Sequence, residues 1–200
     1  MQARSKTMVE MIMRATARIL VRDGYEALTT NRVAEEAGAS VGSLYQYFSS
    51  KQQLVAALLE QHVDETMAQL REELPQLSLL PVERAVPRFV ELMIASHRVQ
   101  PALHRVFVEQ LPRVGEFEKV ETSLNEGLAL TEAYLRAHAC DVRPQNHALS
   151  AFLLVYTVEA LTHAAVLSRP DFLATPEFVS EISALILGYL QPRLPAAVPG

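Results

Sequence analysis

Residues 28–51 read LTTNRVAEEAGASVGSLYQYFSSK, and this stretch decides the fold of the N-terminal part of the 200-residue chain. Its apolar, glycine and hydroxyl residues have the spacing of a helix-turn-helix, two short helices joined by a tight turn. Ala34 is small where the two helices cross closely, Gly38 takes the turn at low steric cost, and Leu44 anchors the second helix against the first. The second helix of such a motif can enter the major groove of DNA.

Apolar residues recur at intervals of three and four along most of the chain, which is the period of one helix face. We expect a first helix that ends at Gly24, followed by helices over residues 30–37, 41–47, 50–73, 82–98, 102–111, 116–139, 145–167 and 176–190. The sequence therefore predicts an all-α fold of about nine helices. It divides into a three-helix helix-turn-helix domain over 1–50, a second helical domain over 51–192 and a C-terminal tail over 193–200.

Composition narrows the class of protein. Hydrophobic residues make up 50% of the chain and charged residues 20%, which suffices for a sizeable core. The net charge of -5 argues against a protein that coats nucleic acids, so DNA affinity must come from a local patch. The first 51 residues carry more cations than acids, and the rest of the chain is acidic. Cys140 is the only cysteine, which excludes an intrachain disulfide and a cysteine-based zinc site and agrees with a reducing cytoplasm.

One apolar segment, residues 148–167, is long enough to span a bilayer. Glu159 and His163 interrupt it, and an acid inside a spanning helix is costly, so a buried helix of a soluble assembly is favoured. The N-terminal residues include Glu10 and are not followed by a small-residue cleavage site, so no secretory signal is expected. These features predict a cytoplasmic protein without a membrane partner.

The helix-turn-helix segment resembles the signature of the TetR family of transcriptional regulators. The residues that carry the resemblance are Leu28-Thr29-Thr30, Val33-Ala34, Ala37-Gly38, Gly42-Ser43-Leu44-Tyr45, Tyr47-Phe48 and Lys51-Leu54. The resemblance covers about the N-terminal quarter of the chain and departs from the family at Ala39, where valine is frequent. It implies an all-helical homodimer whose three N-terminal helices bind a palindromic operator and whose larger C-terminal domain binds a small effector. Such a protein is not an enzyme.

Five positions take DNA-contact roles from this resemblance. Thr30 and Ser43 are implied to contact phosphates, and Lys51 is implied to clamp a phosphate at the start of a helix. Tyr45 and Tyr47 are implied to contact the backbone or the bases. These roles suit the chemistry, because free amides and the helix dipole favour an anion at a helix N-terminus.

Few long polar side chains are available to distinguish one DNA sequence from another. Gln46 can bind an adenine edge and Val41 can contact a thymine methyl group, whereas Gly42 offers no side chain. Discrimination therefore falls to Asn31 and Arg32, or to the shape of the DNA. The segment predicts DNA binding without predicting the operator sequence.

The same segment allows two other interpretations. It can be an ordinary helical hairpin of an α-bundle with its tyrosines in the core. Residues 38–42, GASVG, also match the G-x-S-x-G nucleophile elbow of serine hydrolases, with Ser40 as nucleophile. That elbow needs a strand before the serine, and here a helix is expected, so the hydrolase is a remote alternative.

The C-terminal domain is expected to hold a largely apolar effector pocket with a few polar groups. The candidate residues combine aromatic, sulfur and titratable side chains at helical spacing: His62, Phe89, Met93, His97, Phe107, Phe152, Tyr156, Glu159 and His163. Alternatively, Phe89 and Met93 belong to the core and the Glu159–His163 pair sits at a wet dimer edge. Two ligands do not make a metal site, so neither a metal nor a cofactor is expected. A regulator controlled by a protein partner remains the alternative to a small-molecule effector.

The last two expected helices, 145–167 and 176–190, carry more apolar surface than one small domain readily buries, which predicts a homodimer through a four-helix interface. The residues expected to be exposed for this contact are Ala151, Val155, Val158, Leu161, Ala165, Ile182, Leu185, Ile186 and Tyr189. The alternative is that they form the core of a monomer.

Overall fold

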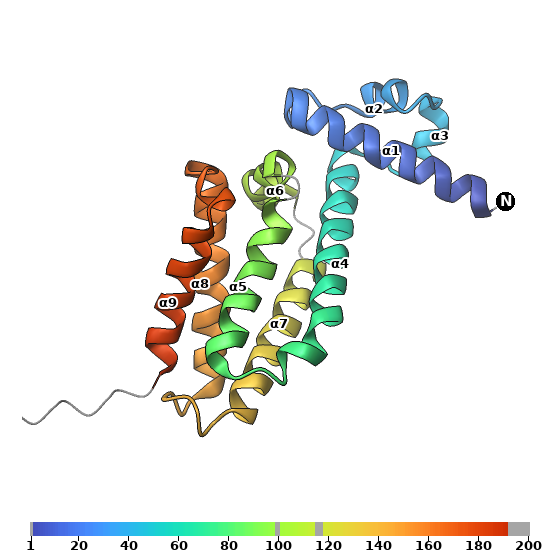
Figure 1. Ribbon diagram of the computed structural model, residues 1–200. Coiled ribbons are helices and arrows are strands. Elements are labelled where there is room, and N and C mark those ends of the chain that lie inside the picture. The colour runs from blue at the N-terminus through green and yellow to red at the C-terminus, as the bar shows by residue number, and fades with distance from the viewer. Residues whose placement is uncertain (1, 99–100, 115–117, 192–200) are drawn as a thin grey trace, which may run out of the picture. The chain divides into compact units, whose positions relative to one another are not determined.

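The computed structural model describes residues 2–98, 101–114 and 118–191, and within these ranges the chain forms nine α-helices and one 3-10 helix (Figure 1). No strand occurs in the described ranges, so the prediction of an all-α fold is confirmed. The elements are α1 (Gln2–Asp23), α2 (Thr30–Glu36), α3 (Val41–Tyr45), α4 (Lys51–Leu77), α5 (Val82–Arg98), α6 (Pro101–Val114), α7 (Glu118–Ala137), α8 (His147–Ser168), η1 (Phe172–Ala174) and α9 (Pro176–Leu190).

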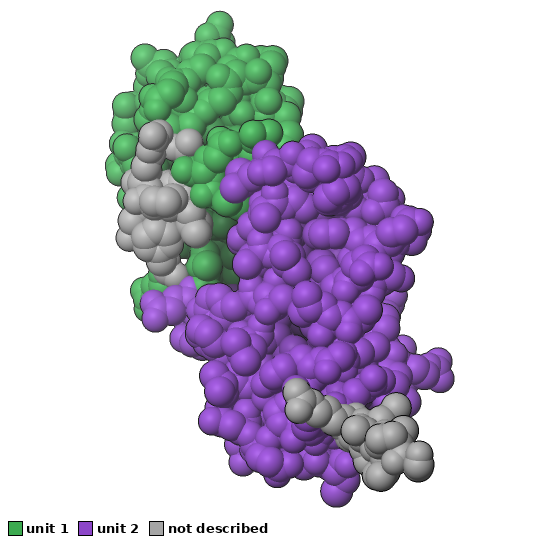
Figure 2. All heavy atoms as spheres, turned by 90° about the vertical axis from the view of Figure 1, so that its left-hand side faces the viewer, with its two compact units in different colours: residues 1–65, 100–120 green, residues 66–99, 121–200 purple. Residues whose placement is uncertain are grey.

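The chain divides into two compact units, shown in green and purple in Figure 2. Unit 1 comprises residues 1–65 and 100–120, and unit 2 comprises residues 66–99 and 121–200. Unit 1 is larger than the predicted domain 1–50, because α6 packs against α1 and the first part of α4 joins the same core. The predicted tail, 193–200, lies outside the described residues.

Local signals in the sequence set the short helices of unit 1. Gly24 and Gly38 adopt positive φ angles of 80° and 65°, which end α1 and turn the chain between α2 and α3. The hydroxyl of Thr29 accepts a hydrogen bond from the Arg32 amide at the start of α2. The last helical residue of α3 is Tyr45, so α3 is shorter than the predicted range 41–47 and Tyr47 lies in the turn that follows.

The core of unit 1 is built from the predicted inward positions of the helix-turn-helix and the apolar faces of α1, α4 and α6. Leu28, Val33 and Leu44 have no exposed surface, and Ile12 and Leu54 are equally buried. The small residue at position 34 and the leucine at position 44 thus occupy the places that their spacing predicts.

In unit 2, α5 packs against both α8 and α9, which run alongside it in Figure 1. Val90 and Ile94 of α5 are fully buried, and Val158 and Ile186 are nearly so. The helix α4 continues through Pro75 to Leu77, beyond its predicted end at residue 73. Proline removes one backbone hydrogen bond, and here the helix ends within half a turn of it.

Among the described residues, α8 is the one helix that is long and apolar enough to cross a membrane by length and composition alone. Eight of its residues, among them Leu154, Val158 and Val166, are buried in unit 2. Part of α8 therefore contributes to the core of unit 2.

Two glycines provide a matched test of backbone conformation, since a Cβ atom added to either Gly38 or Gly127 meets no atom within 4 Å. Gly38→Ala places a side chain at φ 65° and should lower the free energy of unfolding by about 1 kcal/mol. Gly127→Ala lies inside α7 and should raise it by about 0.5–1 kcal/mol. Urea unfolding followed by circular dichroism measures both changes, and equal effects of the two substitutions would contradict the assignment of the Gly38 turn.

Candidate functional site

Six of the ten residues predicted to contact DNA lie in α3 and the turn that follows it. Val41, Gly42 and Tyr45 are exposed, whereas Leu44 on the opposite side of the same helix is buried. Gln46 and the exposed Tyr47 follow directly in the turn. We call the exposed side chains of residues 41–47 the α3 surface. Its residues are mostly small or aromatic, as the sequence indicated.

A hydrogen bond joins two of the predicted contact residues. Thr30 is the first residue of α2 and Tyr45 the last of α3, and the Thr30 Oγ1 atom lies 3.1 Å from the Tyr45 hydroxyl. The bond holds together two hydroxyl groups that are fifteen residues apart in the sequence. Together they offer one polar site at the edge of the α3 surface, and each hydroxyl can also bond a phosphate oxygen.

Lys51 is held in place by the loop between α1 and α2. Its ammonium lies 4.3 Å from the centre of the Tyr25 ring and donates to the Tyr25 carbonyl oxygen at 3.4 Å. Lys51 is the first residue of α4, where the backbone amides of the first turn point outward. The amide of Gln53 in that turn already bonds the Ser50 hydroxyl. A fixed cation at this helix start is suited to an anionic oxygen.

Arg32 and Asn31 differ in how freely they can reach a ligand. Asn31 is exposed, whereas the Arg32 guanidinium pairs with Asp23 and donates to the Ala27 carbonyl oxygen at 2.9 Å. Arg22 and Arg32 hold the pKa of the Asp23 carboxyl below its ordinary value through these hydrogen bonds and their charge. Arg32 therefore supports the α1–α2 connection in the free chain, and its role in base recognition stays a prediction.

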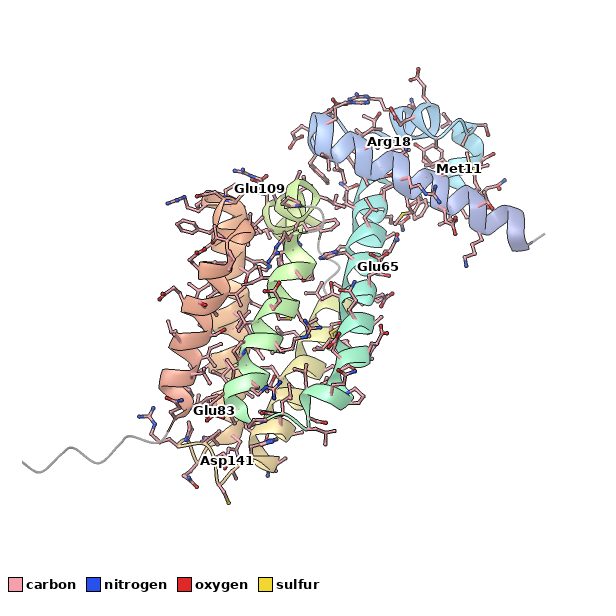
Figure 3. All side chains as sticks on the ribbon, in the orientation of Figure 1. Met11, Arg18, Glu65, Glu83, Glu109 and Asp141 are labelled. Carbon is pink, nitrogen blue, oxygen red and sulfur yellow. The ribbon has the colours of Figure 1, made fainter. Side chains whose placement is uncertain are left out.

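A second ion-pair group joins α1 to the end of α2. Arg18, labelled in Figure 3, donates to Glu36 at 3.0 Å, and Arg22 lies 3.5 Å from the same carboxylate. The hydrogen bond from Arg18 and the charge of Arg22 hold the pKa of the Glu36 carboxyl below its ordinary value. Several of the cations in the first 51 residues are thus engaged with carboxylates of unit 1.

Ser40 has a structural task. Its hydroxyl accepts a hydrogen bond from the Ser43 amide at 3.0 Å and lies 2.8 Å from the Ser43 hydroxyl, so it caps the N-terminus of α3. It follows α2 and the Gly38 turn, without the preceding strand that a nucleophile elbow needs. The serine hydrolase interpretation is therefore wrong.

A cavity of about 430 Å³ lies inside unit 2. It is lined by residues of the part of α4 that belongs to unit 2 and of α5, α7, α8 and α9. Most of its lining is apolar and includes Leu70, Leu74, Val86, Phe89, Leu130, Leu135, Leu154 and Ile186. Three hydroxyl-bearing residues, Ser78, Thr131 and Tyr134, also line it.

Of the nine residues predicted to bind an effector, Phe89 is the one among the described lining residues of this cavity. His62 and Phe107 lie in unit 1, with ring centres 5.7 Å apart. His62 Nε2 also lies 3.2 Å from His104 Nδ1, and burial lowers the pKa of His62. These contacts make His62 and Phe107 part of the unit 1 interior.

Four other predicted effector residues form a polar group between α5 and α8 in unit 2. The Met93 carbonyl oxygen lies 2.7 Å from His97 Nδ1, and the His97 ring centre lies 5.3 Å from that of His163. His163 Nε2 lies 3.2 Å from a carboxylate oxygen of Glu159, so the expected pairing of these two residues is present. Burial raises the pKa of the Glu159 carboxyl, and the charge of His163 opposes this.

Phe152 and Tyr156 are exposed on α8, and their ring centres are 4.5 Å apart. None of the residues predicted to bind an effector lies on α7, although α7 lines the cavity. The signal of its lining residues was present, since Gly127, Leu130, Thr131 and Tyr134 recur at helical intervals along one face.

The expected exposure of the dimer residues needs a correction. Six of the nine are buried within the single chain, because these faces of α8 and α9 pack against α5: Ala151, Val155, Val158, Ala165, Ile182 and Ile186. Tyr189 is half-buried, with its hydroxyl 3.0 Å from that of Ser150. Leu161 and Leu185 are exposed as predicted. The exposed apolar side chains of these two helices, here called the outer face, are Leu149, Phe152, Leu153, Tyr156, Leu161 and Leu185.

Two family models match the chain. Residues 12–58 match the model for bacterial regulatory proteins of the tetR family, and residues 81–190 match that for the C-terminal domain of tetracyclin repressor-like proteins. The first match covers the helix-turn-helix, and the second contains α5 to α9.

Two curated proteins resemble a part of this chain. The uncharacterized HTH-type transcriptional regulator YvkB of Bacillus subtilis is 45% identical over 51 residues, or 26% of this chain. The HTH-type transcriptional activator FasR of Mycolicibacterium smegmatis is 40% identical over 60 residues, or 30% of this chain. The aligned part spans 27% of the length of each relative.

Solved structures share the fold over nearly the whole chain. SmeT, described as the repressor of the Stenotrophomonas maltophilia multidrug efflux pump SmeDEF, has been solved as a complex with triclosan. That structure superimposes with a TM-score of 0.67 at 20% sequence identity, covering 96% of this chain and 97% of SmeT.

The raised pKa of Glu159 predicts how stability depends on pH. A carboxyl whose pKa is higher in the folded chain destabilises the fold once pH exceeds its unfolded value, and has no such effect when protonated in both states. Glu159→Gln should therefore raise the free energy of unfolding at pH 7 and leave it nearly unchanged at pH 4. Urea titrations at both pH values test this, with the exposed Glu181→Gln as control. A loss of stability at pH 7 would mean that the pair with His163 outweighs burial.

Proposed function

The chain belongs to the TetR family of bacterial regulatory proteins, and we propose that it is a ligand-responsive transcriptional regulator that binds a palindromic operator as a homodimer. Members of this family are transcriptional regulators and not enzymes. The observation that carries the proposal is the α3 surface, bordered by the Thr30–Tyr45 hydrogen bond and lying in the same unit as the Lys51 ammonium fixed on Tyr25.

The proposed DNA complex follows from these groups. The exposed residues of α3 enter the major groove, with Val41 and Gln46 at the base edges. The hydroxyls of Thr30, Ser43 and Tyr45 and the ammonium of Lys51 contact phosphates, which fixes the orientation of α3. Asn31 and Tyr47 add contacts at the edge of the surface. In a two-fold dimer the half-sites are separated by one helical turn, about 34–36 Å, or a multiple of it.

The proposed regulation uses the cavity of unit 2. A small, largely apolar effector binds there and releases the protein from its operator, which makes it a repressor. The size and apolar lining of the cavity support this, and SmeT, which has the same fold, binds triclosan. Because α4 carries both Lys51 and the lining residues Leu70 and Leu74, one helix links DNA contact and ligand contact along the chain. We expect a protein with this role to be located in the cytoplasm.

The proposed dimer forms through the outer face of α8 and α9. Its six large apolar side chains have exposed fractions from 37% for Leu161 to 57% for Leu185. Exposed apolar side chains on two helices that follow each other in the sequence are typical of a four-helix contact between two subunits. The polar group around Glu159 and His163 lies on the same helix α8 but is only partly exposed.

DNA binding is tested with a random-sequence duplex library, from which the protein should select a palindromic site. On that site Lys51→Ala should weaken binding about tenfold and reduce the salt slope by about one, because one phosphate contact is lost. Tyr45→Ala should weaken binding by a similar factor. Arg84→Ala removes one positive charge at an exposed position of α5 and serves as the control. We expect this variant to bind the site with unchanged affinity. Fluorescence anisotropy at two salt concentrations measures these constants, and unaffected binding in Lys51→Ala and Tyr45→Ala contradicts the proposed interface.

The dimer is tested by placing a charge on the outer face. Leu185→Glu or Phe152→Asp should shift the protein from dimer to monomer in sedimentation velocity, because an unpaired carboxylate would be buried in the contact. Leu79→Glu is the matched control, since Leu79 is the most exposed large apolar residue that the structure describes and lies outside the outer face. A dimer that survives both outer-face substitutions would rule out this interface.

A further inference from the structure

The residues that line the cavity of unit 2 indicate which kind of ligand can bind there. This inference rests on the proposed function, in which the cavity binds an effector. None of the described residues that line the cavity is charged. Transfer of an ion from water into such a lining is strongly unfavourable unless a counter-charge or several hydrogen bonds receive it. The lining therefore selects against a ligand that must enter as an ion.

The three hydroxyls of the lining have their hydrogen atoms committed to backbone carbonyls. Tyr134 donates to Leu80 at 2.8 Å, Thr131 donates to Gly127 at 2.9 Å, and Ser78 donates to Pro75 at 3.0 Å. An oxygen that has already donated keeps its lone pairs and can still accept. Toward a ligand these hydroxyls are therefore acceptors, and a ligand acceptor such as a carboxylate finds no donor among them.

The electrostatics near Tyr134 also disfavour an anionic ligand. Burial first, and then the negative charges of Glu83 and Asp141, together raise the pKa of Tyr134 to about 12. Figure 3 labels these two acids where α5 begins and where the chain leaves α7, at the same end of unit 2. Tyr134 thus stays neutral and keeps its hydrogen, and the neighbouring negative charge repels an anionic ligand group.

We propose that the cavity takes an uncharged lipophilic molecule whose polar group is a hydrogen-bond donor, such as a long-chain or aromatic alcohol, and that it rejects the corresponding carboxylate. The donor of the ligand bonds the oxygen of Tyr134, Thr131 or Ser78, and its apolar part lies against the leucines of α4 and α7.

Three probes of equal chain length separate the components of this proposal: 1-dodecanol, dodecanoate and the methyl ether of 1-dodecanol. Binding is measured by calorimetry and thermal shift at pH 8, where the carboxylate is ionised. We expect the alcohol to bind, the ether to bind about fivefold more weakly because its donor is missing, and dodecanoate to bind at least about 100-fold more weakly. Equal affinity for the alcohol and the carboxylate, or for the alcohol and the ether, overturns the proposal, as does no binding of the alcohol.

A pair of α7 variants locates the site. Gly127 shares a helix face with the lining residues Leu130, Thr131 and Tyr134, and a Cβ atom there meets no atom within 4 Å. Gly127→Leu should fill part of the cavity, improve helix propensity and weaken 1-dodecanol binding at least tenfold. Ala129→Leu adds a side chain of the same size at an exposed position of α7 and should leave binding unchanged. Unchanged binding in Gly127→Leu overturns the assignment of the ligand to this cavity.

Operator binding by the same preparations keeps the two proposals apart. Protein that selects and binds a palindromic DNA site but does not distinguish the three probes refutes the ligand class alone. Protein that binds 1-dodecanol selectively but no DNA refutes the proposed regulator and leaves the ligand class standing.

Discussion

The burial of Leu44 is the constraint on which the DNA-facing part of the molecule depends. The helix α3 has only five residues, so this one fully buried side chain decides which side of the helix faces the core of unit 1. Burying a leucine contributes about 1.5–3 kcal/mol, which exceeds what so short a helix gains from propensity. Val41, Gly42 and Tyr45 are exposed because Leu44 is not. The Gly38 turn and the Ser40 cap then fix where α3 begins.

Around Leu44, the charged side chains of unit 1 mainly pair with one another. Arg18, Arg22 and Arg32 all contact Asp23 or Glu36, and these exposed pairs orient the α1–α2 connection more than they stabilise it. A chain with a net charge of -5 thereby keeps few cations free near α3. Lys51 matters in the proposed interface for this reason, because the Tyr25 ring holds its ammonium without neutralising it.

In unit 2, by contrast, the titratable group between α5 and α8 is separate from the uncharged lining of the cavity. The titratable pair Glu159–His163 and the His97 ring form one group between α5 and α8, while the cavity is lined by carbon and by hydroxyls that have already donated. A titratable group placed inside the cavity would itself need a partner, which would consume the space that a ligand could occupy. The separation of these two environments is the physical basis for inferring an uncharged ligand.

Local patterns in the sequence determined the helices, the two glycine turns and the inward position of Leu44, because each depends on residues within one or two turns of the chain. The sequence also placed Phe89 among the candidate effector residues. It failed where several helices meet. The apolar residues of α8 and α9 were expected on the surface, yet Ala151, Val158 and Ile182 pack against α5, since both faces of these helices are apolar and their periodicity cannot tell them apart. Likewise, only the tertiary structure brought residues of α4, α5, α7, α8 and α9 together to line one cavity and set Arg32 against Asp23, because such contacts join residues that no local spacing relates.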